Sequence, residues 1–243
     1  MDYIWLFFIG LIANVLGILA GGGGLISLPA MLVMGIPVHS AIGANKVSNT
    51  FSSLLSFIVI YKYKEVTVKE AIILIPLCLG GGIAGGLLAS LLTESTMTIL
   101  AVVLLSFALL SSFLGSSDFE GNRPLVVNKK SGASLFGIGL YDGIFGPGSG
   151  TLMMYLLSHL GISYIRAVGL VRIAIFSSCF GASITYIATG KIMWAVTIAL
   201  LIGSVSGAQI GVHLARKLKV EYVKPLLRIV TVVLLIQIIV SNF

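Results

Sequence analysis

The sequence has few charged residues: Asp, Glu, Lys and Arg together make up 9% of its 243 residues, whereas soluble domains carry about 25%. This shortage excludes an ordinary water-soluble domain. Hydrophobic residues account for 58% of the chain, and the mean hydropathy is +1.12. Most of the chain must therefore face lipid or other apolar segments, and in lipid an α-helix satisfies its own backbone. We predict an all-α, polytopic protein of the cell membrane.

Residues that carry chemistry are also scarce. The chain has 2 cysteines and 3 histidines, and none of the histidines has metal-ligand spacing to another. Cys78 and Cys179 lie inside apolar runs, where a cysteine mostly fills space. Asp142 is the one carboxylate well inside an apolar stretch, while an enzyme needs an acid–base pair, a metal cluster or an activated nucleophile. We therefore expect no enzyme activity, no metal and no cofactor.

The basic excess, a formal net charge of +7, sits in short loops between apolar runs. That distribution is typical of cytoplasmic loops under the positive-inside rule, and it does not predict binding to nucleic acid. No nucleotide-binding loop is visible either.

Glycine, in contrast, is abundant. Residues 21–24 are four consecutive glycines inside an apolar run, and the sequence FGPGSGT follows the same pattern at residues 145–151. Glycine in a helix interior costs about 1 kcal/mol relative to alanine, so both runs predict interrupted helices. Backbone freed from a helix at bilayer depth must be buried in protein or line a cavity.

The two runs belong to an internal repeat with an offset of 126 residues and no gap. Gly22 aligns with Gly148, Gly24 with Gly150, and the cation Lys46 with the cation Arg172. We divide the single membrane domain into a first repeat (residues 1–114), a cytoplasmic linker (115–131) and a second repeat (132–243). Transporters are commonly built from such duplications.

Loop charges select the topology of each repeat. If the first apolar stretch of each repeat is a kinked span, seven basic residues lie on one side of the membrane and six on the other. If that stretch is instead a re-entrant hairpin, twelve lie on one face and only Lys191 on the other, a strong positive-inside bias. We therefore predict two inverted repeats, each made of a glycine-broken re-entrant helical hairpin and three transmembrane helices, with both termini outside the cytoplasm.

This topology brings both breaks towards the middle of the membrane. At 1.5 Å per residue, about seven residues of helix carry Lys46 roughly 10 Å back to the glycine tip. Two helix N-termini then point free N–H groups at one place, beside two cations, which is a site for an oxyanion. The predicted substrate-binding residues are Gly21, Gly22, Gly23, Gly24, Asn45, Lys46, Asn49, Gly146, Gly148, Ser149, Gly150 and Arg172. Asp142 breaks the repeat, since its partner is Leu16. It is either a counter-charge to Lys46 or Arg172 or the carrier of a coupling proton.

Two segments carry a family resemblance: LYDGIFGPGSG at residues 140–150, and GGGGLISLP at residues 21–29, the latter followed by Gly35 and by Ala44, Asn45 and Lys46. They resemble the two half-motifs of the sulfite exporter TauE/SafE family. The resemblance covers nearly the whole chain. It implies a multi-spanning carrier, usually an exporter, of sulfite, sulfoacetate and other organosulfonates, with the glycine tips, Asn45, Lys46 and Arg172 as motif positions.

We thus expect a secondary transporter that exports a small sulfur-containing oxyanion by alternating access. It would be coupled to a proton or sodium ion, or act as a uniporter. An anion channel that uses the same site is the alternative. The expected partners are the anion and the lipid bilayer, and the oligomeric state is open.

Overall fold

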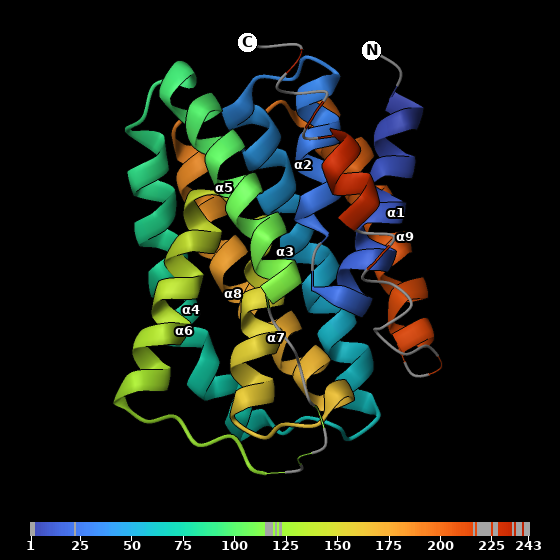
Figure 1. Ribbon diagram of the computed structural model, residues 1–243, viewed down its shortest axis with the longest axis vertical. Helices are drawn as coiled ribbons and strands as arrows, with labels where there is room; N and C mark the ends of the chain where they lie inside the picture. The colour runs from blue at the N-terminus through green and yellow to red at the C-terminus, as the bar shows by residue number, and fades with distance from the viewer. Residues whose placement is uncertain are drawn as a thin grey trace.

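The structure is a computed structural model that describes residues 3–21, 23–114, 119, 121, 123–215, 217, 225, 228–234, 236 and 240. Within these residues it is helical and contains no strand (Figure 1). The helices are α1 (Tyr3–Ala20), α2 (Gly24–Val33), α3 (Val38–Lys62), α4 (Val68–Ser90), α5 (Glu94–Leu114), α6 (Lys129–Ile144), α7 (Ser149–His159), α8 (Tyr164–Ala188) and α9 (Trp194–Ala215). Residues 228–234 are also helical. The prediction of an all-helical fold is confirmed.

Local sequence signals define several helix ends. Thr67 begins α4 with a capping box, in which its side chain accepts a hydrogen bond from the backbone N–H of Glu70 while the Glu70 carboxylate accepts from the backbone N–H of Thr67. Asn128 and Ser131 form the same reciprocal pair at the start of α6. Each pair satisfies two N–H groups that a helix start would leave without partners.

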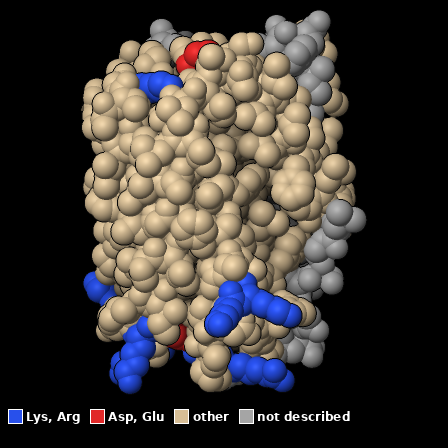
Figure 2. Space-filling model, turned by 90° about the vertical axis from the view of Figure 1, so that its left-hand side faces the viewer, with Lys and Arg blue, Asp and Glu red and all other residues tan. Residues whose placement is uncertain are grey.

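Within the described residues, five helices are long and apolar enough to cross a membrane: α1, α4, α5 (over residues 94–111), α8 and α9. Figure 2 shows a broad belt without Lys, Arg, Asp or Glu around the visible face of the molecule. The chain is therefore a multi-pass membrane protein. Helix α3 is as long as α8, but it buries a row of polar side chains, among them Asn45, Lys46 and Ser48. The last predicted span, near the C-terminus, lies largely outside the described residues.

The duplication seen in the sequence reappears in the helix bounds. Helices α3 and α8 are 126 residues apart at both ends, and α1, α2 and α4 correspond in the same way to α6, α7 and α9 within two residues. Figure 1 shows α2 returning towards the end of the molecule from which α1 starts, and α7 returning towards the opposite end, from which α6 starts.

The two repeats interlock. The most extensive helix contact joins α1 of the first repeat to α9 of the second, and its counterpart joins α6 to α4. Helix α3 likewise packs on α9, and its counterpart α8 packs on α4. Each repeat therefore buries its helices mainly against the other repeat.

Glycines allow these helices to approach closely. A Cβ atom on Gly207 of α9 would lie 2.1 Å from the carbonyl oxygen of Leu11 in α1, and one on Gly85 of α4 would lie 2.2 Å from that of Leu140 in α6. Neither position has room for a side chain. This is the small-residue packing that membrane helices use in place of a hydrophobic driving force.

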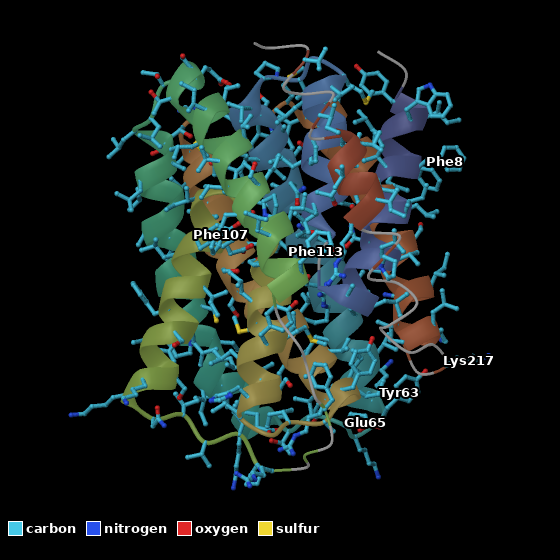
Figure 3. All side chains as sticks on the ribbon, in the orientation of Figure 1. Phe8, Tyr63, Glu65, Phe107, Phe113 and Lys217 are labelled. Atoms are coloured by element: carbon cyan, nitrogen blue, oxygen red, sulfur yellow. The ribbon has the colours of Figure 1, made fainter. Side chains whose placement is uncertain are left out.

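The charged side chains concentrate at the ends of the molecule, with most of the blue atoms of Figure 2 at its lower end. Figure 3 places Tyr63, Glu65 and Lys217 near this end. Arg166 also belongs to this group, since it pairs with Glu70 and donates to the carbonyl oxygen of Arg123. Lys191 contacts a different region: its Nζ donates to the carbonyl oxygen of Ser90, at the last turn of α4.

Candidate functional site

The two helix interruptions meet in the interior. A Cβ atom on Gly21 would lie 2.6 Å from the carbonyl carbon of Gly150, and one on Gly150 would lie 2.4 Å from the carbonyl oxygen of Gly21. Gly21 also has a φ of +76°, which residues with a Cβ rarely adopt. Gly24 lies against Pro147 in the same region. The breaks of the two repeats are thus in direct backbone contact, and only glycine fits where they touch. Gly22 lies outside the described residues.

Each interruption ends one helix and begins another. Helix α2 begins after Gly23 and α7 after Gly148, and neither of these N-cap residues makes a side-chain capping hydrogen bond. The N–H groups of a first helical turn carry partial positive charge and have no partners within the helix. The N–H of Ser149 donates to the carbonyl oxygen of Gly146 and that of Ile26 to Gly23. The other N–H groups of these two first turns are donors that an anion can use.

The two cations occupy equivalent places in the repeat and bind equivalent targets. Lys46 on α3 donates through Nζ to the backbone carbonyl of Asp142, in the last turn of α6. Arg172 on α8 donates through Nη2 to the carbonyl oxygen of Gly17, in the last turn of α1, at 3.3 Å. Each cation thus contacts the C-terminal end of a broken helix of the other repeat, where the helix dipole carries partial negative charge. The carbonyl oxygen of Gly17 also accepts a hydrogen bond from the backbone N–H of Gly21 at 2.8 Å.

The carboxylate of Asp142 distinguishes the two cations. It forms an ion pair with Lys46, whose Nζ lies 3.3 Å from Oδ1, and both side chains are buried. Ser149 donates to Oδ1 at 2.6 Å, Ser178 donates to Oδ2 at 2.5 Å, and the thiol of Cys179 lies 3.3 Å from Oδ2. Asp142 was predicted as a counter-charge to either Lys46 or Arg172, and the structure contains the ion pair with Lys46.

Arg172 has no such partner. Its residue is 5% exposed, it forms no ion pair within the described part of the chain, and its Nε donates to no acceptor there. A buried charge with an unused donor is costly in a membrane protein, which makes Arg172 a candidate functional residue. A guanidinium can also offer two parallel donors to a pair of oxyanion oxygens.

A small cavity of about 30 Å³ lies beside this guanidinium. Its lining combines both breaks with α3 and α8: Asn14, Gly17, Gly21, Gly23, Gly24, Asn45, Asn49, Asp142, Gly146, Ser149, Gly150, Arg172 and Ile175. Most of the residues predicted from sequence are therefore brought together around one space. Its lining suits a small polar ligand.

Two predicted residues lie just outside this lining. Lys46 does not line the cavity; its side chain is buried and forms an ion pair with Asp142, which does line it. Gly148 faces α5, where an added Cβ would lie 2.7 Å from the Cβ of Ala108. Its φ of +84° explains the glycine, because the chain must turn sharply there before α7 begins.

Asn14 lines the cavity but is not among the residues predicted from the sequence. Its amide donates to the carbonyl oxygen of Gly10 at 3.2 Å, and its Oδ1 accepts from Ser52 at the same distance. The signal that could have identified Asn14 in the sequence is a polar side chain inside the apolar first stretch. Asn45 and Asn49 are hydrogen-bonded to each other, and Asn45 donates to Ser27 at 2.5 Å, which ties α3 to α2.

No three His, Cys, Asp or Glu side chains lie together as a metal site in the described ranges. What the site offers is a small cavity with amide, hydroxyl and backbone donors and one guanidinium without a counter-charge. In a bundle of apolar helices, broken helices around a buried polar centre are typical of membrane transporters. The fold and site thus define a multi-pass membrane protein of the transporter class.

Comparison with known proteins identifies the family. Residues 6–238 match the model of the family described as sulfite exporter TauE/SafE. This match covers nearly the whole chain, so the protein belongs to the TauE/SafE family.

The chain is also similar to bacterial proteins named as transporters. It is 31% identical to "Probable membrane transporter protein ORF9" of Sinorhizobium sp. over 96% of this chain and 90% of that protein. It is 26% identical to a "Probable membrane transporter protein" of Haemophilus influenzae (93% and 90% covered) and 26% identical to "Probable membrane transporter protein YfcA" of Escherichia coli K12 (94% and 86% covered). No solved structure matches the chain.

Proposed function

We propose that the protein is a secondary carrier that exports a small sulfur-containing oxyanion, which it binds in the cavity between the two helix breaks. The observation that carries this proposal is the buried guanidinium of Arg172, which lines the cavity without a carboxylate partner. An oxyanion in the cavity would supply the missing negative charge and accept the unused Nε–H. The sulfur chemistry and the outward direction come from the family description.

The remaining lining suits the same ligand. The uncapped starts of α2 and α7 present N–H donors, and Asn45, Asn49 and Ser149 add side-chain polar groups. Glycine on both sides lets backbone approach the ligand closely. Few negatively charged groups oppose an anion here, since the one carboxylate in the lining is already paired with Lys46.

We further propose that the repeats are inverted, with six full spans, two re-entrant hairpins, and the basic loops in the cytoplasm. Support comes from the opposite ends at which α1 and α6 start and from the separation of Lys191 from the other basic loops. In such a carrier the site lies where the repeats meet, and rocking of one against the other exposes it to each side in turn.

The test is flux in proteoliposomes loaded with radiolabelled sulfite. A carrier gives saturable uptake that unlabelled substrate competes away, whereas a channel gives flux that does not saturate. Arg172→Gln should reduce flux by about tenfold or more, because a charge-assisted hydrogen bond is worth about 1.5–3 kcal/mol.

A matched control is Arg166→Gln, which changes the same residue type on the same helix. Arg166 forms an ion pair with Glu70 and donates to the carbonyl oxygen of Arg123, and it does not line the cavity. This variant should therefore retain flux. Equal flux in wild type and Arg172→Gln would contradict the assignment of the site.

A further inference from the structure

The buried charges around the cavity can be counted. Within the described chain, Lys46, Asp142 and Arg172 are the charged side chains buried at the helix breaks. The other buried carboxylate, Glu70, pairs with Arg166. Two cations and one carboxylate leave the site with a formal charge of +1.

The partial charges at the helix ends do not change this formal charge of +1. Each break brings one helix C-terminus and one helix N-terminus to the same place, in the order α1–α2 and α6–α7. Their partial charges of about −0.5 and +0.5 therefore offset one another at each break. The formal charge of the site is therefore that of the three side chains.

From this charge count we propose that the site selects oxyanions that carry a single negative charge and disfavours dianions. This inference rests on the proposed function, because it names the charge class of that ligand. A monoanion brings the occupied site to electrical neutrality. A dianion would leave one uncompensated negative charge in a medium of low dielectric constant, which is costly.

Asp142 is the residue that sets this preference. Its negative charge offsets the positive charge of Lys46, with which it forms an ion pair, and leaves Arg172 as the one uncompensated cation at the site in the described chain. Its repeat equivalent is Leu16, so a symmetric pair of repeats would have left two free cations and a site of charge +2. One carboxylate in one repeat thus converts a site suited to a dianion into a site suited to a monoanion. The monoanions that fit this chemistry are hydrogen sulfite and sulfonates without a second acidic group, which excludes the dianion sulfoacetate.

The experiment measures the dissociation constants of methanesulfonate (charge −1) and sulfate (charge −2) for the purified full-length protein by isothermal titration calorimetry. The informative quantity is the ratio of the two constants in each variant, because the hydration of each anion is the same throughout. Wild type should bind methanesulfonate more tightly than sulfate. Asp142→Asn raises the site charge to +2 and should shift the ratio towards sulfate by about tenfold or more, as expected for one charge at close range in a protein.

Two further variants keep the test independent of stability. The double variant Lys46→Gln/Asp142→Asn returns the charge to +1 and should restore the wild-type ratio. Ser178→Ala removes a hydrogen bond from the same carboxylate at constant charge, so its ratio should stay at the wild-type value even if both affinities fall.

The outcomes separate the two proposals. Binding of both anions with a ratio that Asp142→Asn leaves unchanged, or tighter binding of sulfate by wild type, overturns the charge rule and leaves anion transport standing. Failure of folded wild type to bind methanesulfonate, sulfate or sulfite overturns the proposed function, and the charge rule with it.

Discussion

Lys46 and Arg172 occupy equivalent positions in the two repeats, yet the structure gives them different partners. Both are buried, and both donate to the last turn of a broken helix. Asp142 then pairs with Lys46, while Arg172 keeps an unused donor at the cavity. Duplication explains the similarity, and a single carboxylate at a position where the first repeat has Leu16 explains the difference.

At this scale we predict that Lys46 acts mainly through Asp142. Lys46→Met should lower the unfolding free energy by about 3–5 kcal/mol, because it leaves a buried carboxylate without its cation. Adding Asp142→Leu should recover much of that loss, since a buried pair can be replaced by apolar side chains at little cost. Thermal unfolding in detergent measures both effects.

The control for this prediction is Lys69→Met, at an exposed position in the first turn of α4. It should leave the unfolding midpoint close to that of wild type. If Lys46→Met were as stable as Lys69→Met, the ion pair would have no structural role.

At the scale of elements, glycine serves two purposes in this protein. At Gly21 and Gly150 it lets two interrupted helices touch, and at Gly85 and Gly207 it lets continuous helices pack backbone to backbone. In both cases a Cβ atom has no space. The two pairs have different roles. Gly21 and Gly150 border the cavity, whereas Gly85 holds α4 against α6 and Gly207 holds α9 against α1.

We predict that Gly207→Ala destabilises the protein by about 1–3 kcal/mol, the usual cost of overpacking, because the added methyl group would lie 2.1 Å from the carbonyl oxygen of Leu11. Gly137→Ala, in the middle of α6, is the matched control: no atom lies within 4 Å of its added Cβ. The same substitution should there be neutral or slightly stabilising, since alanine favours a helix by about 1 kcal/mol over glycine. Equal unfolding midpoints for the two variants would contradict close packing of α1 on α9.

At the scale of the whole molecule, the repeats form one body because each packs mainly on the other. Contacts between α1 and α9, α4 and α6, α3 and α9, and α4 and α8 all cross from one repeat to the other. The cavity lies where the repeats meet, and residues of both line it. Neither repeat alone contains a complete site.

The proposed inversion makes a prediction at this scale. Tyr63 follows α3, and Thr189 occupies the equivalent place after α8. Both are exposed, so each can be replaced by cysteine, while the native Cys78 and Cys179 are buried and should react slowly. In intact cells a membrane-impermeant maleimide should label Thr189→Cys, and should label Tyr63→Cys only after permeabilisation.

The competing topology gives a different result. If each repeat crossed the membrane an even number of times, the two equivalent positions would lie on the same side and would be labelled together. That outcome would rule out the inverted arrangement.

Much of this protein could be predicted from its sequence alone. Membrane insertion follows from the shortage of charge, because lipid excludes charged side chains. The helix interruptions at residues 21–24 and 145–150 were predicted from glycine runs, which weaken a helix. Glycine alone does not decide the outcome, because the run at residues 80–82 lies inside the continuous helix α4. The repeat offset of 126 residues predicted which helices would correspond, and the helix bounds agree.

The tertiary structure decided what a linear pattern does not contain. The repeat made Lys46 and Arg172 look alike, and only the approach of α6 to α3 and α8 assigns Asp142 to one of them. Asn14 joins the cavity for the same reason: its place depends on how α1 meets α3. Helix formation and membrane insertion depend on neighbouring residues and local composition, whereas the partner of a buried charge depends on distant segments that packing brings together.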